Sequence, residues 1–363
     1  MATKKRDDLL PILPYDLMMD ILSRLSVECI VRFKCVSKPW RTMFADPQFV
    51  KLHLTRSTNF KLVFTSSFHS LDPMRSLFVL SCGDMVDAAS AWDDGEVGGI
   101  HISDPQETVR ISSSCRGLVL CDTCHGIYLV NPSTKEVIRL PYSPFSKTHY
   151  ASRGLGYDAS LDDYKVVQIS PPSPNDGGEI ITSLYSLKSN SWRKIQEFPY
   201  WIKFSHSGVF LNGNLHWFNY DRKKMVSFSL ADEKYGDVPL PDVNNILETS
   251  LINPGLIGVV GGCLYFVSKT NWRGITFWVM KEYNVRESWT KFKFDIPCCS
   301  MKPLDFSNND ENLFALDGDK FVMCNLKERT HRHLEFDTTP HFWNETVTCL
   351  ETLVSPKGYY IPM

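Results

Sequence analysis

Residues 13–40 read LPYDLMMDILSRLSVECIVRFKCVSKPW, and apolar side chains recur in them at helical spacing. Leu17, Ile21, Leu22 and Leu25 fall at positions i, i+4, i+5 and i+8, so they share one face of a helix of roughly three turns. Pro14 suits the first turn of this helix, because a first-turn N–H has no helical partner in any case. The pattern predicts an amphipathic helix.

A second helix is predicted to follow directly. Ser26 is a typical N-cap residue, and it precedes three apolar residues, Ile30, Phe33 and Val36, that we expect to point inward. Lys38 stands before a proline and is therefore biased away from the α region. We expect the second helix to stop there.

Two further short helices are predicted before residue 57. The first carries Trp40 and Phe44, and the second is opened by the pair Asp46-Pro47 and ends near Arg56. A unit of about forty residues cannot bury this much apolar surface within itself. The helical unit therefore needs a partner, which is either another protein or the rest of its own chain.

Size and composition indicate a folded protein in a reducing compartment. The chain has 363 residues, which is more than one hydrophobic core usually supports, so two domains are expected. The 39 lysines and arginines nearly balance the 41 aspartates and glutamates, which argues against nucleic acid as a partner. The 11 cysteines are scattered, and we find no signal peptide or long apolar run. We expect a cytoplasmic and nuclear location without membrane insertion.

Beyond residue 60 the sequence changes to short runs that are typical of strands. Examples are KLVF at 61–64, SLFVL at 76–80, GLVLC at 117–121 and GIYLV at 126–130, each bounded by turn residues. We therefore divide the chain into a flexible tail (1–12), a helical domain (13–57) and an all-β domain (60–363).

One sequence motif recurs in the all-β domain, and its spacing predicts the architecture. A strand, a polar turn and a second strand repeat every roughly 40 to 55 residues, which is the length of a four-stranded propeller blade. The copies are LVNPSTKEVIRLP (129–141), LYSLKSNSWRKI (184–195), SFSLADEKYGDVPLP (227–241), KEYNVRESWTKF (281–292) and MCNLKERTHRHLEF (323–336). Companion hairpins are expected at 210–218, 259–267 and 313–323. We predict six or seven blades, the last closed by pairing 347–354 with an early strand; an irregular β-sandwich is the alternative.

Motifs for chemistry are weak in this sequence. Cys121, Cys124 and His125 spell the C-x-x-C-H pattern of haem attachment, but they fall in a predicted turn. His331 and His333 alternate on a predicted strand, yet no third metal ligand is positioned by the sequence. Nucleophile-elbow, P-loop and dinucleotide-binding patterns are not found. We expect no cofactor, no metal and no catalytic residue.

Residues 13–53 and the repeats resemble a known family. The stretch LPYDLMMDILSRLSVECIVRFKCVSKPWRTMFADPQFVKLH resembles the F-box. NPSTKEVIRLP, GLGYDASLDDYKVV (154–167), YSLKSNSW and WVMKEYNVRESWTKF resemble the F-box-associated domain of plant F-box/kelch-repeat proteins. The resemblance implies an α+β multidomain protein: a small N-terminal helical F-box followed by an all-β, kelch-like propeller. The sequences of the repeats most resemble those of family members that turn over immune receptors, with the pollen self-incompatibility group as a near relative.

The resemblance also implies partners and binding residues. The F-box would dock on a Skp-type adaptor, which links to cullin and RING subunits, and the β-domain would capture a protein target for ubiquitination and proteasomal degradation. The implied adaptor-binding residues are Leu13, Pro14, Leu17, Ile21, Leu22, Leu25, Phe33, Val36 and Trp40.

A substrate surface is harder to locate from the sequence. Trp272 and Arg273 lie in a predicted hairpin turn, where an exposed aromatic beside a cation resembles an interface anchor; packing of Trp272 on a neighbouring blade is the alternative. A propeller lectin or propeller enzyme that binds a small molecule is the rival function. The target, its degron, the subgroup, the blade count and the oligomeric state stay open.

Overall fold

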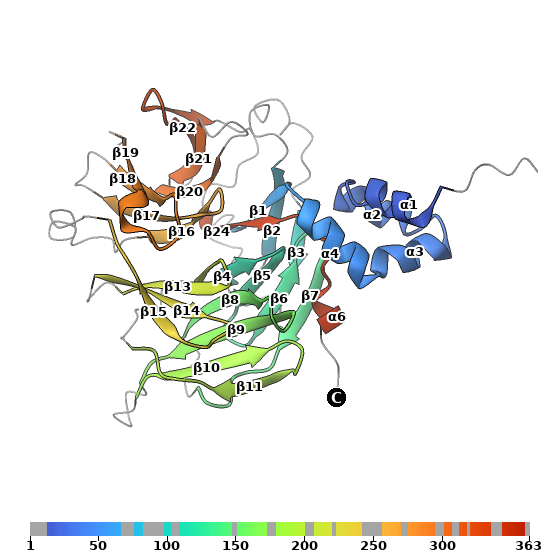
Figure 1. The fold of residues 1–363 in the computed structure, drawn as a ribbon, viewed down its shortest axis with the longest axis horizontal. Coiled ribbons are helices and arrows are strands. Elements are labelled where there is room, and N and C mark those ends of the chain that lie inside the picture. The colour runs from blue at the N-terminus through green and yellow to red at the C-terminus, as the bar shows by residue number, and fades with distance from the viewer. Residues whose placement is uncertain are drawn as a thin grey trace, which may run out of the picture.

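A computed structural model of the chain shows four helices followed by an all-β domain (Figure 1). The residues that it describes are 13–66, 76–82, 98–102, 109–146, 151–172, 179–199, 207–219, 223–241, 256–269, 275–294, 301–306, 312–317, 320–334 and 343–359. The proposed tail, 1–12, lies outside them. The helices are α1 (Tyr15–Leu22), α2 (Val27–Phe33), α3 (Lys38–Ala45) and α4 (Pro47–Arg56), and a short α6 (Pro356–Tyr359) lies near the C-terminus.

Side-chain caps set the starts of α2, α3 and α4, whereas α1 follows Pro14 without such a cap. The Ser26 hydroxyl accepts a hydrogen bond from the Cys29 N–H at 3.4 Å, as predicted for α2, and the Asp46 carboxylate accepts one from the Gln48 N–H at 2.7 Å. Ser37 caps α3 in the same way, through the Trp40 N–H at 3.3 Å. Lys38 is therefore the first residue of α3 rather than the end of α2, which stops at Phe33. The predicted end of α2 was wrong, because the cap at Ser37 outweighs the bias against a helical residue before proline.

The four helices share a small core of their own. Val27, Ile30, Phe44 and Phe49 are buried in it, and Trp40 packs edge-on against Phe44 with ring centroids 5.8 Å apart. Val36 does not join this core, contrary to our expectation: it follows the end of α2 and is 66% exposed.

The described strands form six four-stranded antiparallel sheets, which we number as blades 1 to 6. From first to fourth strand, blade 1 is β24 (Trp343–Leu350), β1 (Phe60–Ser66), β2 (Ser76–Cys82), β3 (Gly98–His101); blade 2 is β4 (Arg110–Cys115), β5 (Leu118–Asp122), β6 (Ile127–Asn131), β7 (Glu136–Leu140). Blade 3 is β8 (Ser152–Asp158), β9 (Asp163–Ser170), β10 (Ile181–Ser186), β11 (Ser191–Lys194); blade 4 is β12 (Val209–Leu211), β13 (Asn214–Asn219), β14 (Lys224–Ser229), β15 (Tyr235–Val238). Blade 5 is β16 (Leu256–Val260), β17 (Cys263–Lys269), β18 (Ile275–Met280), β19 (Trp289–Phe294); blade 6 is β20 (Met301–Phe306), β21 (Asn312–Asp317), β22 (Lys320–Asn325), β23 (Thr330–Leu334).

The six sheets close into a ring, as in a propeller. The first strands β24, β4, β8, β12, β16 and β20 each contact the next, and β20 contacts β24 again. Blade 1 is completed by both ends of the all-β domain, since β24 pairs with β1 in the register Leu62↔Thr348. This confirms the predicted closure, and six is within the predicted number of blades.

The recurring motif corresponds to the outer hairpin of a blade in four of its five copies: β6–β7, β10–β11, β14–β15 and β22–β23. The copy at 281–292 is different. Residues 281–288 form a turn and a short 3-10 helix, η2 (Arg286–Ser288), and only then does β19 begin. The strand that pairs with β19 is β18, which ends at Met280.

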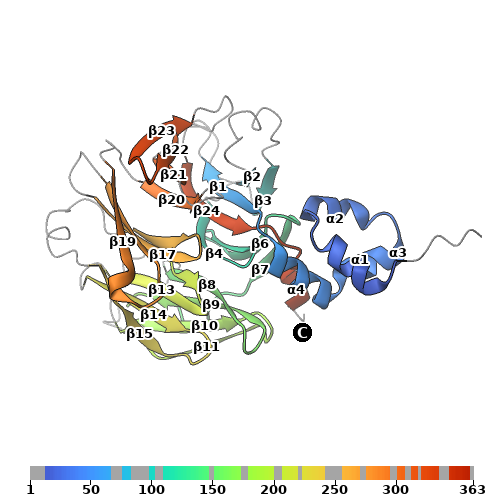
Figure 2. The same ribbon diagram turned by 45° about the horizontal axis from the view of Figure 1, so that its top comes forward.

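The ring has two faces, which we name by the position of the helices. β24 and β4 run in the same direction, because the Glu345 carboxylate accepts the Ile111 N–H and the Ser114 hydroxyl donates to the Thr348 carbonyl at 2.9 Å. We call the face where the first strands end the proximal face, since β24 ends there at Leu350 beside Phe60, shortly after α4. The distal face is where the first strands begin. Figures 1 and 2 show the four helices together at one side of the β-domain, with α4 next to the sheets.

The helical unit is attached through α4 and the segment that follows β24. Leu54 of α4 packs with residues of blades 2 and 3, while Leu353 packs into the helical core. The Ser57 hydroxyl donates to the Glu351 carbonyl at 2.7 Å. The buried Asn131 amide donates to the carbonyls of Thr352 and Val354 at 3.0 and 2.7 Å. The first residue of the NPSTK motif (131–135) thus anchors this segment to blade 2.

A buried histidine links blades 4 and 5 and predicts acid sensitivity. Nδ1 of His216 donates to the Val209 carbonyl at 3.1 Å, and Nε2 accepts from the Tyr283 hydroxyl at 2.8 Å. Burial lowers the pKa of His216 from 6.5 to about 4. The unfolded chain then binds a proton more readily than the folded one, so stability is full above pH 6.5 and falls as the pH decreases toward 4. Between pH 7.5 and 4.5 this group should cost about 2 to 3 kcal/mol.

Urea unfolding at the two pH values, in the wild-type chain and in His216→Asn, measures this contribution. Other groups also titrate, so both proteins should lose stability in acid, but the variant should lose about 2 to 3 kcal/mol less. An equal loss in both proteins would show that His216 carries no such effect.

Candidate functional site

Exposed apolar side chains gather on the helical unit. Of the ten large hydrophobic residues that are strongly exposed in the described part of the chain, six belong to it: Leu13 (40%), Tyr15 (51%), Leu17 (51%), Ile21 (52%), Val31 (40%) and Val36 (66%). Single exposed apolar residues are ordinary, but such a concentration on a small unit marks an interaction surface.

The spacing along α1 explains how this surface arises. Leu13, Leu17 and Ile21 are four residues apart and therefore follow one line along the helix. Met19 and Leu22 face the other way and are buried in the helical core. The helix thus buries one apolar side within its own unit and leaves a second apolar side uncovered.

The structure sorts the nine predicted adaptor-binding residues into three groups. Leu13, Pro14, Leu17, Ile21 and Val36 are exposed; Leu25, Phe33 and Trp40 are half-buried against the helical core; Leu22 is buried within it. The exposed residues can meet a partner directly. Leu22 instead fixes the orientation of α1, so any part it has in binding acts through that helix.

Two exposed apolar residues, Tyr15 and Val31, were missed by the sequence reasoning. Tyr15 does not fall on the spacing of Leu17 and Ile21, and Val31 directly follows the buried Ile30, so neither continued a predicted apolar stripe. The sequence did contain a signal for both: each is an apolar residue at a helix position that does not face the core.

Ion pairs hold this surface in place relative to the β-domain. Asp20 of α1 pairs with Arg56 at the end of α4 at 2.5 Å and with Arg24 at 3.2 Å. The hydrogen bond from Arg56 keeps the pKa of the Asp20 carboxyl below its ordinary value. Arg56 also donates to the Ser23 hydroxyl at 2.7 Å. Because α4 packs on blades 2 and 3, these contacts set the direction in which α1 faces outward.

The size of the surface is sufficient for a stable complex. Fully burying one such side chain contributes roughly 1.5–3 kcal/mol, so covering six that are about half exposed contributes on the order of 5 kcal/mol or more before association costs. Half-buried rings such as Trp40 and Phe33 would add to this sum at their exposed edges.

The sequence motifs for metal or haem are not assembled into a site. Cys121 is buried in the core, where burial raises the pKa of its thiol, whereas Cys124 and His125 are exposed in the turn after β5. His331 and His333 share the exposed side of β23, with ring centroids 5.8 Å apart. Nowhere in the described ranges do three His, Cys, Asp or Glu side chains gather closely enough to hold a metal ion. Among the described residues, no helix combines the length and the apolar character that crossing a membrane requires.

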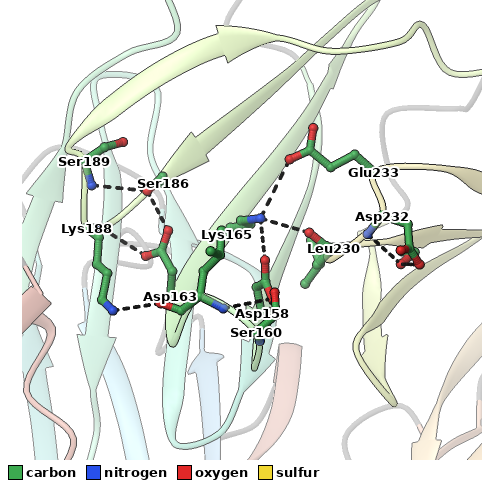
Figure 3. Close-up of polar contacts among 12 residues, drawn as sticks. Asp158, Ser160, Asp163, Lys165, Ser186, Lys188, Ser189, Leu230, Asp232 and Glu233 are labelled. Carbon is green, nitrogen blue, oxygen red and sulfur yellow. Dashed lines mark hydrogen bonds and ion pairs between the residues drawn. The ribbon is translucent and has the colours of Figure 1, made fainter.

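A cluster of charges around the buried pair Lys165 and Asp158 joins blades 3 and 4 (Figure 3). Nζ of Lys165 lies 2.6 Å from the Asp158 carboxylate, 2.9 Å from the Leu230 carbonyl and 3.7 Å from the Glu233 carboxylate. Burial alone would raise the pKa of Asp158, but hydrogen bonds from Lys165 and Ser160 hold it below its ordinary value. Arg193 supplies a second cation, because it pairs with the Glu233 carboxylate. Each carboxylate thus has a cationic partner, as expected for a contact that fixes two blades together.

The predicted substrate-binding pair, Trp272 and Arg273, lies outside the described residues. The described strands on either side of the pair are β17, which ends at Lys269, and β18, which begins at Ile275; both of these strand ends lie at the distal face.

Comparisons with known proteins agree with this architecture. Residues 94–348 match the model of the F-box associated beta propeller domain, and residues 10–52 match the F-box domain. The chain is 28% identical to F-box protein CPR1 of Arabidopsis thaliana over 385 residues, covering 95% of this chain and 90% of that one. It is also 28% identical to an F-box/kelch-repeat protein of the same plant over 300 residues, covering 77% of this chain and 78% of that one. A third Arabidopsis thaliana F-box protein is 29% identical over 320 residues, with 77% and 71% covered.

Proposed function

Because the chain belongs to the F-box proteins that carry an F-box associated β-propeller domain, we propose that it is the substrate-recognition subunit of a Skp-cullin-F-box ubiquitin ligase. In this proposal the helical unit binds a Skp-type adaptor, and the propeller holds the protein that is to be ubiquitinated. The single observation that carries it is the concentration of exposed apolar side chains along α1 and α2, within the residues that match the F-box.

The proposed mechanism is proximity rather than chemistry by this chain. Binding of a target to the propeller, while the adaptor connects the chain to cullin and RING subunits, raises the effective concentration of a target lysine near the ubiquitin-conjugating enzyme. The family suggests a receptor that is not itself catalytic, and no residue of this chain is needed to make or break a bond.

The finer parts of the proposal concern target and location. We propose degradation of the captured target by the proteasome and a place of action in the cytoplasm and nucleus. The sequence similarity of the repeats suggests an immune receptor as the target class, and this stays a prediction.

Co-expression with a Skp-type adaptor tests the proposal. The adaptor should co-purify with the full chain and increase its soluble yield, and cullin should be recovered with the pair. A chain that lacks residues 1–57 should lose both proteins. If the full chain fails to retain the adaptor, or if the truncated chain retains it equally well, the ligase function is wrong, and a propeller that binds a small molecule becomes the better account.

A further inference from the structure

The turn between blades 2 and 3 displays an aromatic residue on the distal face. Among the described residues of the β-domain, Phe60, Tyr142, Leu161 and Val285 are the large hydrophobics that are strongly exposed. The strand directions place Phe60, Leu161 and Val285 at the proximal face, because they lie at starts of second strands or after first and third strands. Tyr142 follows the fourth strand β7 and lies at the distal face, away from the helical unit.

Hydrogen bonds fix the position of this turn. The Trp192 indole N–H donates to the Pro141 carbonyl at 2.7 Å, and the hydroxyls of Ser143 and Ser183 are 3.0 Å apart. Ser143 also accepts the Phe145 N–H at 3.4 Å. The turn is therefore tied to β10 and β11 of blade 3, and Tyr142, which is 42% exposed, directly precedes the buried Ser143. A side chain held in this way loses little conformational entropy when a partner covers it.

Two exposed cations lie beside the aromatic rings of the turn. The Arg139 guanidinium is 5.9 Å from the centre of the Tyr142 ring, and Nζ of Lys194 is 5.7 Å from the centre of the Phe145 ring. Neither cation forms an ion pair within the part of the chain that the structure describes, and the exposed Glu197, three residues after Lys194, pairs with neither. In contrast, Arg24, Arg32 and Arg193 each have a carboxylate partner.

We propose that Arg139, Tyr142, Phe145 and Lys194, which we call the distal rim surface, bind an acidic segment of the target protein. This inference rests on the proposed function, since it names the kind of partner that the propeller captures. An exposed tyrosine next to an arginine has the composition of an interface anchor, and two cations without a carboxylate partner among the described residues attract an acidic chain. The position also suits a receptor, because Tyr142 lies on the face opposite the one where the chain passes from α4 into blade 1.

Fluorescence anisotropy with two labelled peptides tests this surface on the full chain purified with its adaptor. One peptide alternates glutamate and serine, and the other has lysine in place of each glutamate. The glutamate peptide should bind more tightly than the lysine peptide, and its binding should weaken as salt is added. The double charge reversal Arg139→Glu with Lys194→Glu should weaken it by about tenfold or more, and Tyr142→Ala should also weaken it.

Two control variants distinguish binding at the distal rim surface from nonspecific attraction of the peptide to any exposed cation. Lys291 is also an exposed lysine beside an aromatic ring, 5.1 Å from the centre of Trp278, but it lies on blade 5. Lys291→Glu should leave the affinity unchanged, and the double variant Arg139→Lys with Lys194→Arg should retain binding. Equal weakening by Lys291→Glu, or equal affinity for both peptides, would overturn the assignment.

Adaptor retention, measured on the same samples, distinguishes failure of this inference from failure of the proposed function. The charge-reversed variant should keep its adaptor. If the wild-type chain does not bind the adaptor, the ligase function is wrong; if it binds the adaptor but not the glutamate peptide, only the distal rim surface is wrong.

Discussion

Replacing Leu17 and Ile21 together with glutamate is expected to weaken binding of the Skp-type adaptor by about a hundredfold or more. Both side chains are about half exposed on α1, and each contributes roughly 1 kcal/mol or more when a partner covers it. The substitution removes that gain and also forces two carboxylates toward an apolar interface, which adds several kcal/mol of desolvation cost. Titration calorimetry with purified adaptor measures the loss.

A matched control separates adaptor binding from general loss of solubility. Leu161 is as exposed as Leu17 and Ile21 but lies in the turn between β8 and β9 of the propeller. Leu161→Glu should leave adaptor affinity unchanged. The thermal midpoint of the Leu17→Glu, Ile21→Glu chain should stay near that of the wild type, because neither side chain belongs to the helical core. Full adaptor affinity in that variant would show that α1 does not form the interface.

Lys165→Met is expected to destabilise the propeller by about 3 to 5 kcal/mol. The side chain of Asp158 is fully buried, and its Oδ2 loses the ammonium at 2.6 Å. The hydrogen bonds from Ser160 and from the Leu161 N–H all reach Oδ1, so they do not replace this partner. The Leu230 carbonyl and the Glu233 carboxylate lose a partner at the same time, so the contact between blades 3 and 4 is weakened (Figure 3). Urea unfolding at neutral pH measures the change.

Two further variants test the reason for this loss. Lys188 belongs to the same cluster but is exposed, and its ammonium donates to the Leu161 carbonyl at 2.7 Å, a neutral partner, so Lys188→Met should change stability by about 0.5 kcal/mol or less. The double variant Lys165→Met with Asp158→Asn should recover part of the loss, because the uncompensated charge is removed. If Lys165→Met and Lys188→Met cost the same, burial of the ion pair is not what stabilises the blades.

The helical unit was largely predictable because its signals are local. The caps at Ser26 and Asp46 act within three residues of chain, so the starts of α2 and α4 could be predicted. The single apolar face predicted for Leu17, Ile21, Leu22 and Leu25 was wrong. Leu17 and Ile21 are exposed, Leu22 is buried in the helical core, and α1 ends before Leu25. The end of α2 was not predicted, since it depends on Ser37 starting a new helix where the rule for residues before proline favoured an extended chain. The apolar spacing wrongly placed Val36 inward, although the resemblance included it among the adaptor-binding residues.

The propeller could also be predicted, because its signals lie within single hairpins and recur along the chain. Each outer hairpin repeats its turn chemistry, and hairpins pair with their immediate neighbours in sequence. The copy at 281–292 misled us, because its aromatic residues resemble the repeat while residues 281–288 form a turn and η2. Among aromatic pairs in the repeats, Tyr185 and Trp192 do face each other across β10 and β11, with ring centroids 5.2 Å apart.

The buried polar contacts could not be predicted from the sequence. Lys165 and Glu233 meet across two blades, His216 reaches Tyr283 of the next blade, and Asn131 holds a segment more than two hundred residues later in the chain. A lysine, a histidine or an asparagine in a strand has the same local pattern whether it faces solvent or a neighbouring blade. Only the closed ring decides which of them is buried.

Hydrogen exchange of the full chain, measured by mass spectrometry with and without a Skp-type adaptor, tests the central claim most directly. The account predicts slower exchange in residues 13–36 when the adaptor is added, with the propeller strands unchanged, because the uncovered side of α1 and the end of α2 are where the partner binds. Protection confined to the blades, with residues 13–36 exchanging as fast as in the free chain, would contradict it.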